Sequence, residues 1–442
     1  MGNTERSMDH NSTQLSKKSQ REGEKKPRKR RRRSKRPAEE WSLSNFQVPE
    51  ADDKLRFHDL SLCDELMHAI QDLGYEYCSP IQQKSLPHTL QGKDITGKAQ
   101  TGTGKTAAFL ITAIQYLVKH PIQDEQFLCE PRVLIIAPTR ELVIQIAQDA
   151  KNLCKYLDLQ IHTLIGGEKY DKQLHQMEQR VADIVVATPG RLIDFMSRKD
   201  IFLNLVEILV LDEADRMLDM GFIPQVKQIV RATPRKNERQ TLLFSATFAQ
   251  DILNLSRQWT ENALHIEIEP EQVATETIDQ RVYMVSNEEK LPVTLNILRQ
   301  EEVGLSMIFT NRRDQAIRLH EKLCKNGIKA GVLTGEIAQN KRSKTLNDFK
   351  EGKIRVLVAT DVVGRGIHID GVTHVINYNL PEDPEDYVHR IGRTGRAGVA
   401  GISISFADET EAFQLPAIEE LLGEKLSCTY PPESLLAISE NA

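Results

Sequence analysis

The sequence predicts an α/β protein built from two tandem, doubly wound parallel-sheet domains. From Phe57 onward, short apolar runs rich in β-branched residues alternate with amphipathic stretches, and the second half of the chain repeats the plan of the first. Most of these runs are apolar throughout, as expected for strands that helices cover on both faces. Repeated strand–helix units of this kind specify a parallel sheet, and 442 residues suffice for two domains.

Apolar runs predict the strands in both halves. In the first half the expected strands are Val133–Ala137, His162–Ile165, Ile184–Ala187, Ile208–Leu211 and Thr241–Phe244. In the second half they are Met307–Phe309, Ala330–Leu333, Val356–Ala359, Val375–Tyr378 and Ile402–Phe406. The amphipathic stretches between them predict helices, such as Arg140–Tyr156 and Ile223–Ala232.

Changes in composition predict the boundaries of the domains. The segment Pro270–Thr277 is polar and without periodicity, and it follows the expected last strand of the first half, Ile266–Ile268. We therefore expect a linker there. The predicted divisions are a disordered basic tail, a first domain, a linker, a second domain and a C-terminal tail, spanning 1–50, 51–269, 270–277, 278–430 and 431–442.

The N-terminal tail has a local excess of positive charge. Residues 1–40 hold 14 Lys/Arg against 6 Asp/Glu, whereas the whole protein has a net charge of −5. Like charges at the density of Pro27–Pro37 repel each other, and little apolar surface offsets the entropy of ordering, so disorder is expected. A nonspecific RNA-binding arm is the favoured interpretation. A merely solvated tail, or a nuclear-import signal in a eukaryote, is the alternative.

Composition also excludes several classes of protein. With 40% apolar and 27% charged residues the chain is typical of a soluble globular protein. No apolar run approaches the roughly 18–20 residues that span a bilayer, and no apolar segment follows the start as in a secretory signal. The histidines form no spacing typical of a metal site, and the cysteines are scattered. We therefore expect the cysteines to be free thiols without a special role, as in a reducing compartment, and the protein to be cytoplasmic.

A phosphate-binding loop is the first motif that carries chemistry. Its residues are Ala99, Gln100, Thr101, Gly102, Thr103, Gly104, Lys105 and Thr106, and an apolar stretch, Ala107–Val118, follows as a helix. Glycines let the backbone curl so that its N–H groups converge on phosphate oxygens. Lys105 is expected to neutralise the outer phosphates of ATP, and the Thr106 hydroxyl to hold Mg²⁺. Ala99 replaces the usual first glycine, so the motif needs support from its context.

That support comes from acids at the end of a strand. The apolar run Ile208–Leu211 leads directly into Asp212-Glu213-Ala214-Asp215. A carboxylate at this place is where Mg²⁺ needs a ligand, and the next one can orient the attacking water. An acidic helix start that caps the helix dipole is the alternative for either acid alone.

The second half carries an arginine-rich motif, His389-Arg390-Ile391-Gly392-Arg393-Thr394-Gly395-Arg396. A solvated turn is the alternative to a functional site. Guanidinium groups brought from a second domain onto the γ-phosphate would stabilise the charge of the transition state, and hydrolysis would then require domain closure.

Together with Ser245-Ala246-Thr247, these motifs resemble those of the DEAD-box RNA helicases, in the same order, over about residues 55–430. Three further segments resemble the bacterial RNA helicase B branch of that family: Leu333-Thr334-Gly335, Gly366-Ile367-His368-Ile369 and Tyr170-Asp171-Lys172-Gln173-Leu174. The resemblance implies two RecA-like domains that hydrolyse ATP with Mg²⁺ and bind RNA. It also implies a place in an RNA degradosome with an endoribonuclease, and no membrane partner.

The resemblance implies roles around the nucleotide. Gln82 is expected to read the adenine edge, with Tyr75 and Phe57 packing on the ring. Asp361 and Gly364 are expected to face the nucleotide from the second domain. The arginine fingers are then Arg393 and Arg396, beside the catalytic Lys105, Asp212 and Glu213. Coupling of the nucleotide site to RNA and to the domain interface is implied for Asp215, Ser245, Thr247 and His389.

The resemblance also implies an RNA site made of backbone N–H groups, hydroxyls and a few arginines, which suits binding without base reading. In the first domain its residues are Pro138, Thr139, Arg140, Gly166, Gly167, Thr188, Pro189, Gly190 and Arg191. In the second they are Asn311, Arg312, Gly335, Gln339, Arg342 and Thr360. Two positions depart from the common family pattern: His368 stands where an acid is usual, and Thr334 where a histidine is frequent.

The function expected is ATP-driven local unwinding of short RNA duplexes. A non-enzymatic RNA clamp or scaffold in a decay complex is one alternative, which the presence of Glu213, Arg393 and Arg396 disfavours. A DNA-unwinding enzyme is the other, and comparing ATPase stimulation by RNA and by DNA separates the two.

Overall fold

The computed structural model describes residues 41–99, 102–122, 128–268, 278–300, 303–335, 337–361, 369, 371–395 and 400–437. The basic run and the predicted linker 270–277 lie outside these residues. From Leu43 onward the chain forms one compact unit, which contains two sheets. Among the described residues no helix is both long enough and apolar enough to cross a membrane.

The first sheet has seven strands in the order β3-β4-β2-β5-β6-β1-β7, and every pair is parallel. Its strands are β1 (Ile95–Lys98), β2 (Val133–Ile136), β3 (Ile161–Leu164), β4 (Ile184–Ala187), β5 (Ile208–Leu211), β6 (Gln240–Ser245) and β7 (Leu264–Glu267). The predicted strands are confirmed to within two residues. The exception is β1, which the sequence did not indicate because its residues, Ile-Thr-Gly-Lys, include only one large apolar side chain.

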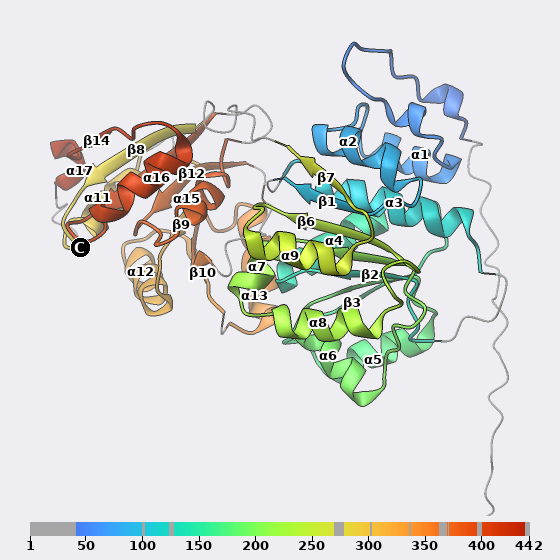
Figure 1. Cartoon of the computed structure of the whole chain (residues 1–442). Coiled ribbons are helices and arrows are strands. Elements are labelled where there is room, and N and C mark those ends of the chain that lie inside the picture. The colour runs from blue at the N-terminus through green and yellow to red at the C-terminus, as the bar shows by residue number, and fades with distance from the viewer. Residues whose placement is uncertain are drawn as a thin grey trace, which may run out of the picture. The chain divides into compact units, whose positions relative to one another are not determined.

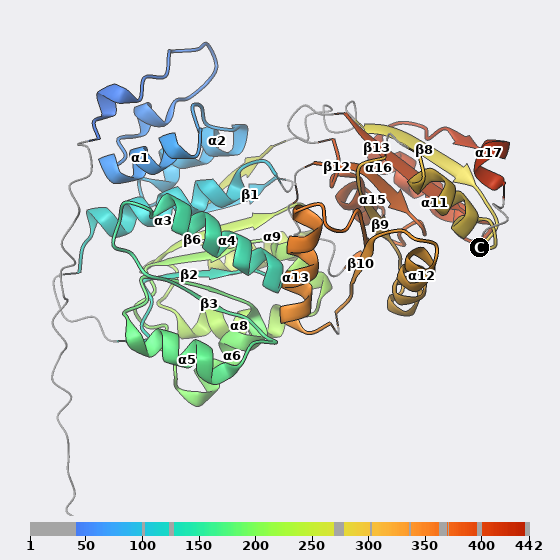
Figure 2. The ribbon, with the colours of Figure 1, turned by 180° about the vertical axis from the view of Figure 1, so that it is seen from behind.

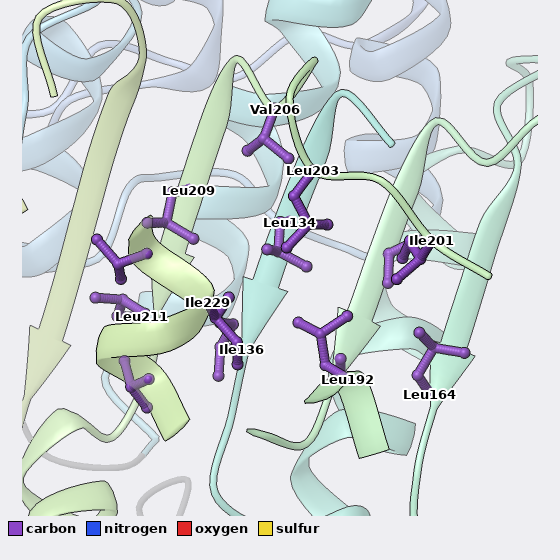
Figure 3. Close-up of a cluster of buried hydrophobic side chains, with 14 of the residues drawn as sticks. Leu134, Ile136, Leu164, Leu192, Ile201, Leu203, Val206, Leu209, Leu211 and Ile229 are labelled. Atoms are coloured by element: carbon purple, nitrogen blue, oxygen red, sulfur yellow. The ribbon is translucent and has the colours of Figure 1, made fainter. Parts of the chain in front are cut away.

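Helices cover both faces of this sheet (Figures 1 and 2). They are α1 (Asp64–Asp72), α2 (Pro80–Thr89), α3 (Lys105–Lys119), α4 (Arg140–Leu153), α5 (Tyr170–Gln179), α6 (Pro189–Arg198), α7 (Ala214–Asp219), α8 (Ile223–Ala232) and α9 (Gln250–Trp259), with short 3-10 turns at Leu43–Asn45 and Phe57–Leu60. Alternate strand residues such as Leu134, Ile136 and Leu209 point to one face, where they pack with Leu192 of α6 and Ile229 of α8 (Figure 3).

The second sheet also has seven parallel strands, in the order β10-β11-β9-β12-β13-β8-β14. They are β8 (Ile278–Met284), β9 (Leu305–Phe309), β10 (Ala330–Leu333), β11 (Val356–Ala359), β12 (Val372–Asn377), β13 (Gly401–Ala407) and β14 (Cys428–Thr429). Its helices are α11 (Lys290–Leu298), α12 (Arg313–Lys325), α13 (Gln339–Lys350), α15 (Pro384–Ile391), α16 (Leu415–Leu422) and α17 (Glu433–Leu436), with a 3-10 turn at Ala412–Gln414. This repeat confirms the prediction of two tandem, doubly wound sheets.

Successive residues of the strands in the second sheet point to opposite faces of that sheet. Ile308 and Val356 pack in one core with residues of α11, α12 and α17. Their neighbours Met307 and Leu357 point to the other face, against Phe349 of α13. Beyond that core, α15 and α16 pack on β8. Since both faces are buried, the strands read as continuous apolar runs.

Two segments that the sequence assigned to the tails are packed in the structure. Phe46 and Val48 are 8% and 7% exposed, and the ring of Phe46 lies 4.7 Å from that of His58. At the other end Leu435 of α17 is 7% exposed and joins the core beside α11. The predicted boundaries at residues 50 and 431 therefore fall inside packed chain, because single apolar residues in a polar stretch give no periodicity to detect.

Parallel strands place all their carboxyl ends at one edge of a sheet, where ligands of open α/β sheets bind. In the first sheet the phosphate loop follows β1, the acids follow β5, and Ser245 ends β6. The predicted RNA-binding residues follow β2, β3 and β4 at the same edge. The strand order thus sets a half predicted to bind the nucleotide, β5-β6-β1 (the nucleotide half), beside a half predicted to bind RNA, β3-β4-β2 (the RNA half).

Candidate nucleotide and RNA site

Two glycines and a lysine set the conformation of the phosphate loop. Gly102 and Gly104 have φ angles of +88° and +93°, in the left-handed region that favours glycine. A Cβ on Gly104 would also lie only 2.5 Å from Nε2 of Gln82. The Nζ of Lys105 donates to the carbonyl of Ala99 at 2.7 Å, across the mouth of the loop. The loop is therefore built to surround an anion, with Lys105 poised beside it.

Gln82 and Ser79 lock the start of α2 to this loop. Oε1 of Gln82 accepts from the Ser79 backbone N–H at 2.9 Å, and Nε2 of Gln82 donates to the Gly104 carbonyl at 3.0 Å. The Ser79 hydroxyl donates to the Thr103 carbonyl at 2.7 Å. Both polar atoms of the Gln82 amide are thus engaged inside the protein. Each of these atoms can still form a second hydrogen bond, so the amide is held in place and retains one donor and one acceptor site for an adenine edge, as predicted.

Asp212 and Glu213 lie at the end of β5, 2% and 7% exposed. Burial raises the pKa of the Asp212 carboxyl to about 6, and the Lys105 ammonium opposes that rise. Glu213 has φ 52° and ψ 54°, a left-handed conformation that is uncommon for a residue with a side chain. Strain of this kind gathers at functional sites, since the surrounding packing must enforce it.

Mg²⁺ fits this donor set. Magnesium is usually bound by one or two carboxylates together with substrate phosphates, and does not need a cage of protein ligands. Asp212 supplies one buried carboxylate and Thr106 one hydroxyl at the start of α3.

Asp215 connects the acids to the end of β6. Its Oδ2 accepts from the backbone N–H groups of Ala246 and Thr247 at 2.8 and 3.0 Å. The Asp215 N–H in turn donates to the hydroxyl of Ser245 at 3.3 Å. The structure therefore brings together three residues predicted to couple the sites, Asp215, Ser245 and Thr247, through direct hydrogen bonds.

The second domain contributes Arg393 and His389 to the same place. A small cavity is lined by Lys105, Glu213 and Asp215 from the first domain and by His389 and Arg393 from the second. The Nε of Arg393 donates to the His389 carbonyl at 3.0 Å, and the residue is 4% exposed. The predicted finger thus shares a cavity with the predicted catalytic acid and lysine.

A larger cavity of about 470 Å³, a size typical of small-molecule sites, opens beside the phosphate loop. Of the two aromatic residues predicted to pack on the adenine ring, Tyr75 lines this cavity. Phe57 is fully buried and stacks against Tyr75, with ring centroids 6.3 Å apart. Tyr77 and Asp149 also line the cavity, and the sequence had not indicated either. Asp149 belongs to no sequence motif, and only the packing of α4 beside the phosphate loop identifies it as a cavity residue.

The Asp149 carboxyl makes the stability of the protein depend on pH. Burial raises its pKa to about 6, opposed by Lys350. A carboxyl whose pKa is higher in the folded state binds its proton more tightly there, so stability falls as pH rises from about 4 to 6. Asp149→Asn removes this penalty and is expected to stabilise the nucleotide-free protein at pH 7.5 by about 1 kcal/mol, a value discounted for partial exposure.

Urea unfolding at pH 7.5 and at pH 5 measures this effect, which should shrink at the lower pH. Asp52→Asn, at an exposed position, is the control and should change neither curve. An equal gain from Asp149→Asn at both values would contradict the assignment.

In the RNA half of the first domain, arginines lie over glycine backbone. The Arg140 guanidinium covers Gly166 and Gly167, so closely that a Cβ on Gly167 would overlap with it. Arg191 donates through Nη2 to the Glu168 carbonyl at 3.1 Å. Its Nη1 is buried and has no hydrogen-bond partner among the described residues, whereas its Nε forms an ion pair with Oδ2 of Asp194 at 3.6 Å. Burial lowers the pKa of Arg191. Buried donors left unpaired are costly, so a partner from a ligand is expected there.

Other predicted residues of this half lie at the starts of helices at the sheet edge. The Thr139 hydroxyl accepts from the Leu142 N–H at 3.3 Å at the start of α4. Thr188 precedes α6, in which Pro189 and Gly190 form the first turn. Helix N-termini at one edge present N–H groups suited to phosphates.

In the second domain, Gln339 and Arg342 reach residues of the first. Arg342 pairs with Glu141 at 2.6 Å, with each side chain 6% exposed. Gln339 accepts from Arg140 and donates to Glu141, both at 3.5 Å. These two predicted RNA contacts are therefore engaged with the first domain in this structure, and the Nε of Arg342 is left buried without a hydrogen-bond partner in the described chain.

The other predicted contacts of the second domain follow its strands: Asn311 and Arg312 after β9, Gly335 after β10 and Thr360 after β11. Arg312 is exposed, whereas Thr360 is 9% exposed. Space around Gly335 is open, since no atom lies within 4 Å of a Cβ placed there.

Arg390 is a site residue that the sequence prediction missed. It is 1% exposed, and its Nε and Nη2 donate to the two oxygens of Asp361, each at 2.6 Å. Its other bonds reach the Asn379 carbonyl at 2.6 Å and Oδ1 of Asn311 at 2.7 Å. The Asp361 carboxylate, predicted to face the nucleotide, is thus held by an arginine of the same domain. A strictly local pattern cannot distinguish this arginine from its neighbours.

Several predicted residues fall outside the described chain and keep the status of predictions: Gln100, Thr101, Gly364, His368 and Arg396.

Comparisons with known proteins agree with this geometry. Residues 79–255 match the DEAD/DEAH box helicase family model, and residues 289–398 match the helicase conserved C-terminal domain. ATP-dependent RNA helicase RhlB of Pseudomonas putida is 59% identical over 87% of this chain and 96% of its own length. RhlB of Pectobacterium atrosepticum is 46% identical over 86% and 89%.

Solved structures give the same result. Dbp5 of S. cerevisiae bound to RNA and ADP BeF3 has a TM-score of 0.75 at 31% identity, covering 85% of this chain and 95% of that one. Mss116p bound to ssRNA and AMP-PNP has a TM-score of 0.76 at 29% identity, covering 88% and 82%. The likeness confirms the two RecA-like domains that the sequence motifs implied.

Proposed function

Because the chain belongs to the RhlB branch of the DEAD-box ATP-dependent RNA helicases, we propose that it separates short RNA duplexes locally, by ATP-driven closure of its two domains on one strand. The observation that carries the proposal is the shared cavity in which Arg393 of the second domain meets Lys105 and Glu213 of the first. A site completed by both domains can turn over ATP only when they are together.

In this mechanism each group of the first domain has one task. The loop N–H groups and Lys105 bind the phosphates, and Glu213 orients the attacking water and accepts its proton. Thr106 and Asp212 would hold Mg²⁺, which neutralises charge on the phosphates when bound. Arg393 stabilises the transition state from the second domain, with Arg396 as the second predicted finger.

The RNA strand is proposed to lie along β3-β4-β2 and the corresponding edge of the second sheet. Arg191 supports this site, since its buried Nη1 has no hydrogen-bond partner among the described residues. Contacts of this kind grip phosphates and 2′-hydroxyls and ignore bases, so the binding is independent of sequence. Asp215, bonded to the Ser245–Thr247 segment, would transmit closure from the nucleotide half to the RNA half.

The biological setting we propose is RNA turnover in the cytoplasm, with an endoribonuclease of a degradosome as partner. The basic run within residues 1–40 would add nonspecific attraction to RNA. A clamp without turnover is the second candidate, favoured only by the fact that Arg342 and Gln339 join the two domains directly.

One experiment distinguishes these functions. A short RNA duplex with a single-stranded overhang is incubated with the protein and ATP, and strand displacement is followed beside ATP hydrolysis. Displacement that requires ATP, with hydrolysis stimulated by RNA and not by a DNA of the same sequence, is expected. Tight ATP-dependent RNA binding without displacement would identify a clamp, and equal stimulation by DNA would reject RNA as the substrate.

A further inference from the structure

We propose that Arg216 is a positioning residue that ties the orientation of Glu213 to the second domain. The inference rests on the proposed function, in which Glu213 orients the attacking water. Arg216 lies on α7, three residues after Glu213, and its side chain is only 6% exposed. A charged side chain is rarely buried to this extent unless it is paired on several sides.

One guanidinium group makes both contacts. The Nη1 of Arg216 lies 3.5 Å from Oε2 of Glu213, and its Nη2 donates to the backbone carbonyl of Asp361 at 3.2 Å. Among the described residues, Arg216 is the only side chain that hydrogen-bonds the Glu213 carboxylate. The rigid fork of a guanidinium can bridge two acceptors, whereas an ammonium is a single compact charge. The acid of one domain is thereby connected to the backbone of the other.

The Asp361 end of this bridge is fixed. Its carboxylate is clamped by both Nε and Nη2 of Arg390, at 2.6 Å each, and Arg390 also donates to Asn311 at 2.7 Å. Asn311 is one of the residues assigned to the RNA site. A continuous hydrogen-bonded path therefore runs from the water-orienting acid through Arg216, Asp361 and Arg390 to the RNA edge of the second domain.

This path has a functional consequence. In the proposed mechanism, separation of the domains removes the hydrogen bond from Arg216 to the Asp361 carbonyl, and with it this link between Glu213 and the second domain. The Arg216 guanidinium is then less firmly positioned beside the Glu213 carboxylate, whose residue has a strained backbone. Closure on RNA restores the bridge and orients the acid, so that RNA binding and water positioning become coupled.

The test compares Arg216→Met and Arg216→Lys with Arg231→Met, an exposed arginine on α8 as control. We expect Arg216→Met to lower the RNA-stimulated kcat about ten- to a hundred-fold, the effect of losing a hydrogen bond to a charged group, with a much smaller change in KM for ATP. The affinity gain for RNA on adding AMP-PNP should shrink by a similar factor. Arg216→Lys should recover part of kcat, since it can still contact Glu213, but not the gain in RNA affinity.

Thermal unfolding separates this role from a structural one. An Arg216 variant that is destabilised but keeps the wild-type kcat and the wild-type gain in RNA affinity would overturn the proposal. If Arg216→Met does not fold, Arg216→Lys decides, and a lysine variant with a full gain in RNA affinity would overturn it. Glu213→Gln provides the distinction from the proposed function: if that variant still turns over ATP, the role of Glu213 itself is wrong. If it is inactive while the Arg216 variants behave as wild type, only the present inference fails.

Discussion

Replacing Glu213 by glutamine is expected to stop ATP turnover while ATP and RNA still bind. The amide has nearly the same size and keeps the packing of a residue that is 7% exposed. It cannot accept the proton of the attacking water, however, and it loses its charge attraction to Arg216. Removal of a group that acts on the transition state in a buried site costs roughly 3–4 kcal/mol, so kcat should fall about a hundred- to a thousand-fold.

The measurement is RNA-stimulated ATP hydrolysis, beside the affinity for a fluorescent ATP analogue and for single-stranded RNA. Glu178→Gln, an exposed glutamate on α5, is the matched control and should keep full activity. Turnover by Glu213→Gln within a few-fold of wild type would show that another group orients the water. Loss of nucleotide binding would instead assign Glu213 to the binding of ATP.

Replacing Arg393 by lysine is expected to have the next largest effect. Arg393 is 4% exposed and lines both cavities beside the phosphate loop. Its planar, delocalised charge can bridge oxygens of the transferred phosphoryl group, which a lysine ammonium cannot reproduce in the same geometry. Arginine fingers contribute roughly 10³–10⁵ to the rate, so a fall of about a thousand-fold in kcat is expected, with Arg396 as a source of residual activity.

This variant should still bind ATP, because Lys105 and the loop are untouched. Nucleotide affinity and single-turnover hydrolysis with saturating RNA check both expectations, and Arg231→Lys serves as the control for the charge-conserving change. A normal rate in single turnover would reject Arg393 as a finger. If Arg393→Lys hydrolysed ATP at the wild-type rate only when RNA was absent, RNA would not be the ligand that brings the domains together.

The sequence reached most of the fold because both sheets are parallel and buried on both faces. Runs such as Val356–Ala359 are then apolar without interruption, and β10, β11, β4 and β5 match their predicted ranges. β1, β8 and β14 were not among the predicted strands. β1 was missed for a tertiary reason. Gly97 lies so near Phe244 of β6 that a Cβ would stand 2.9 Å from its ring, so a strand there needs a small residue and shows no apolar run.

The nucleotide site was similarly predictable where its chemistry is local. A phosphate loop needs glycines and a lysine at fixed spacing, and the acids must follow a strand, so Lys105 and Asp212 were visible in the chain. Tyr77 and Asp149 were not, since they meet the loop from separate elements. Tyr77 and Asp149 can be recognised only by their positions beside the loop, and those positions result from the packing of whole elements.

By itself, then, the sequence determined two parallel α/β domains, and it predicted a phosphate loop with acids at the end of a strand and arginines to complete the site. Only the tertiary structure decided the partners of the charged groups: Arg390 clamps Asp361, and Arg342 pairs with Glu141. The physical reason is that periodicity and spacing act within a few residues and fix which side of an element is buried. Ion pairs and hydrogen bonds between residues 29 to more than 200 positions apart depend on how whole elements pack, which no local pattern encodes.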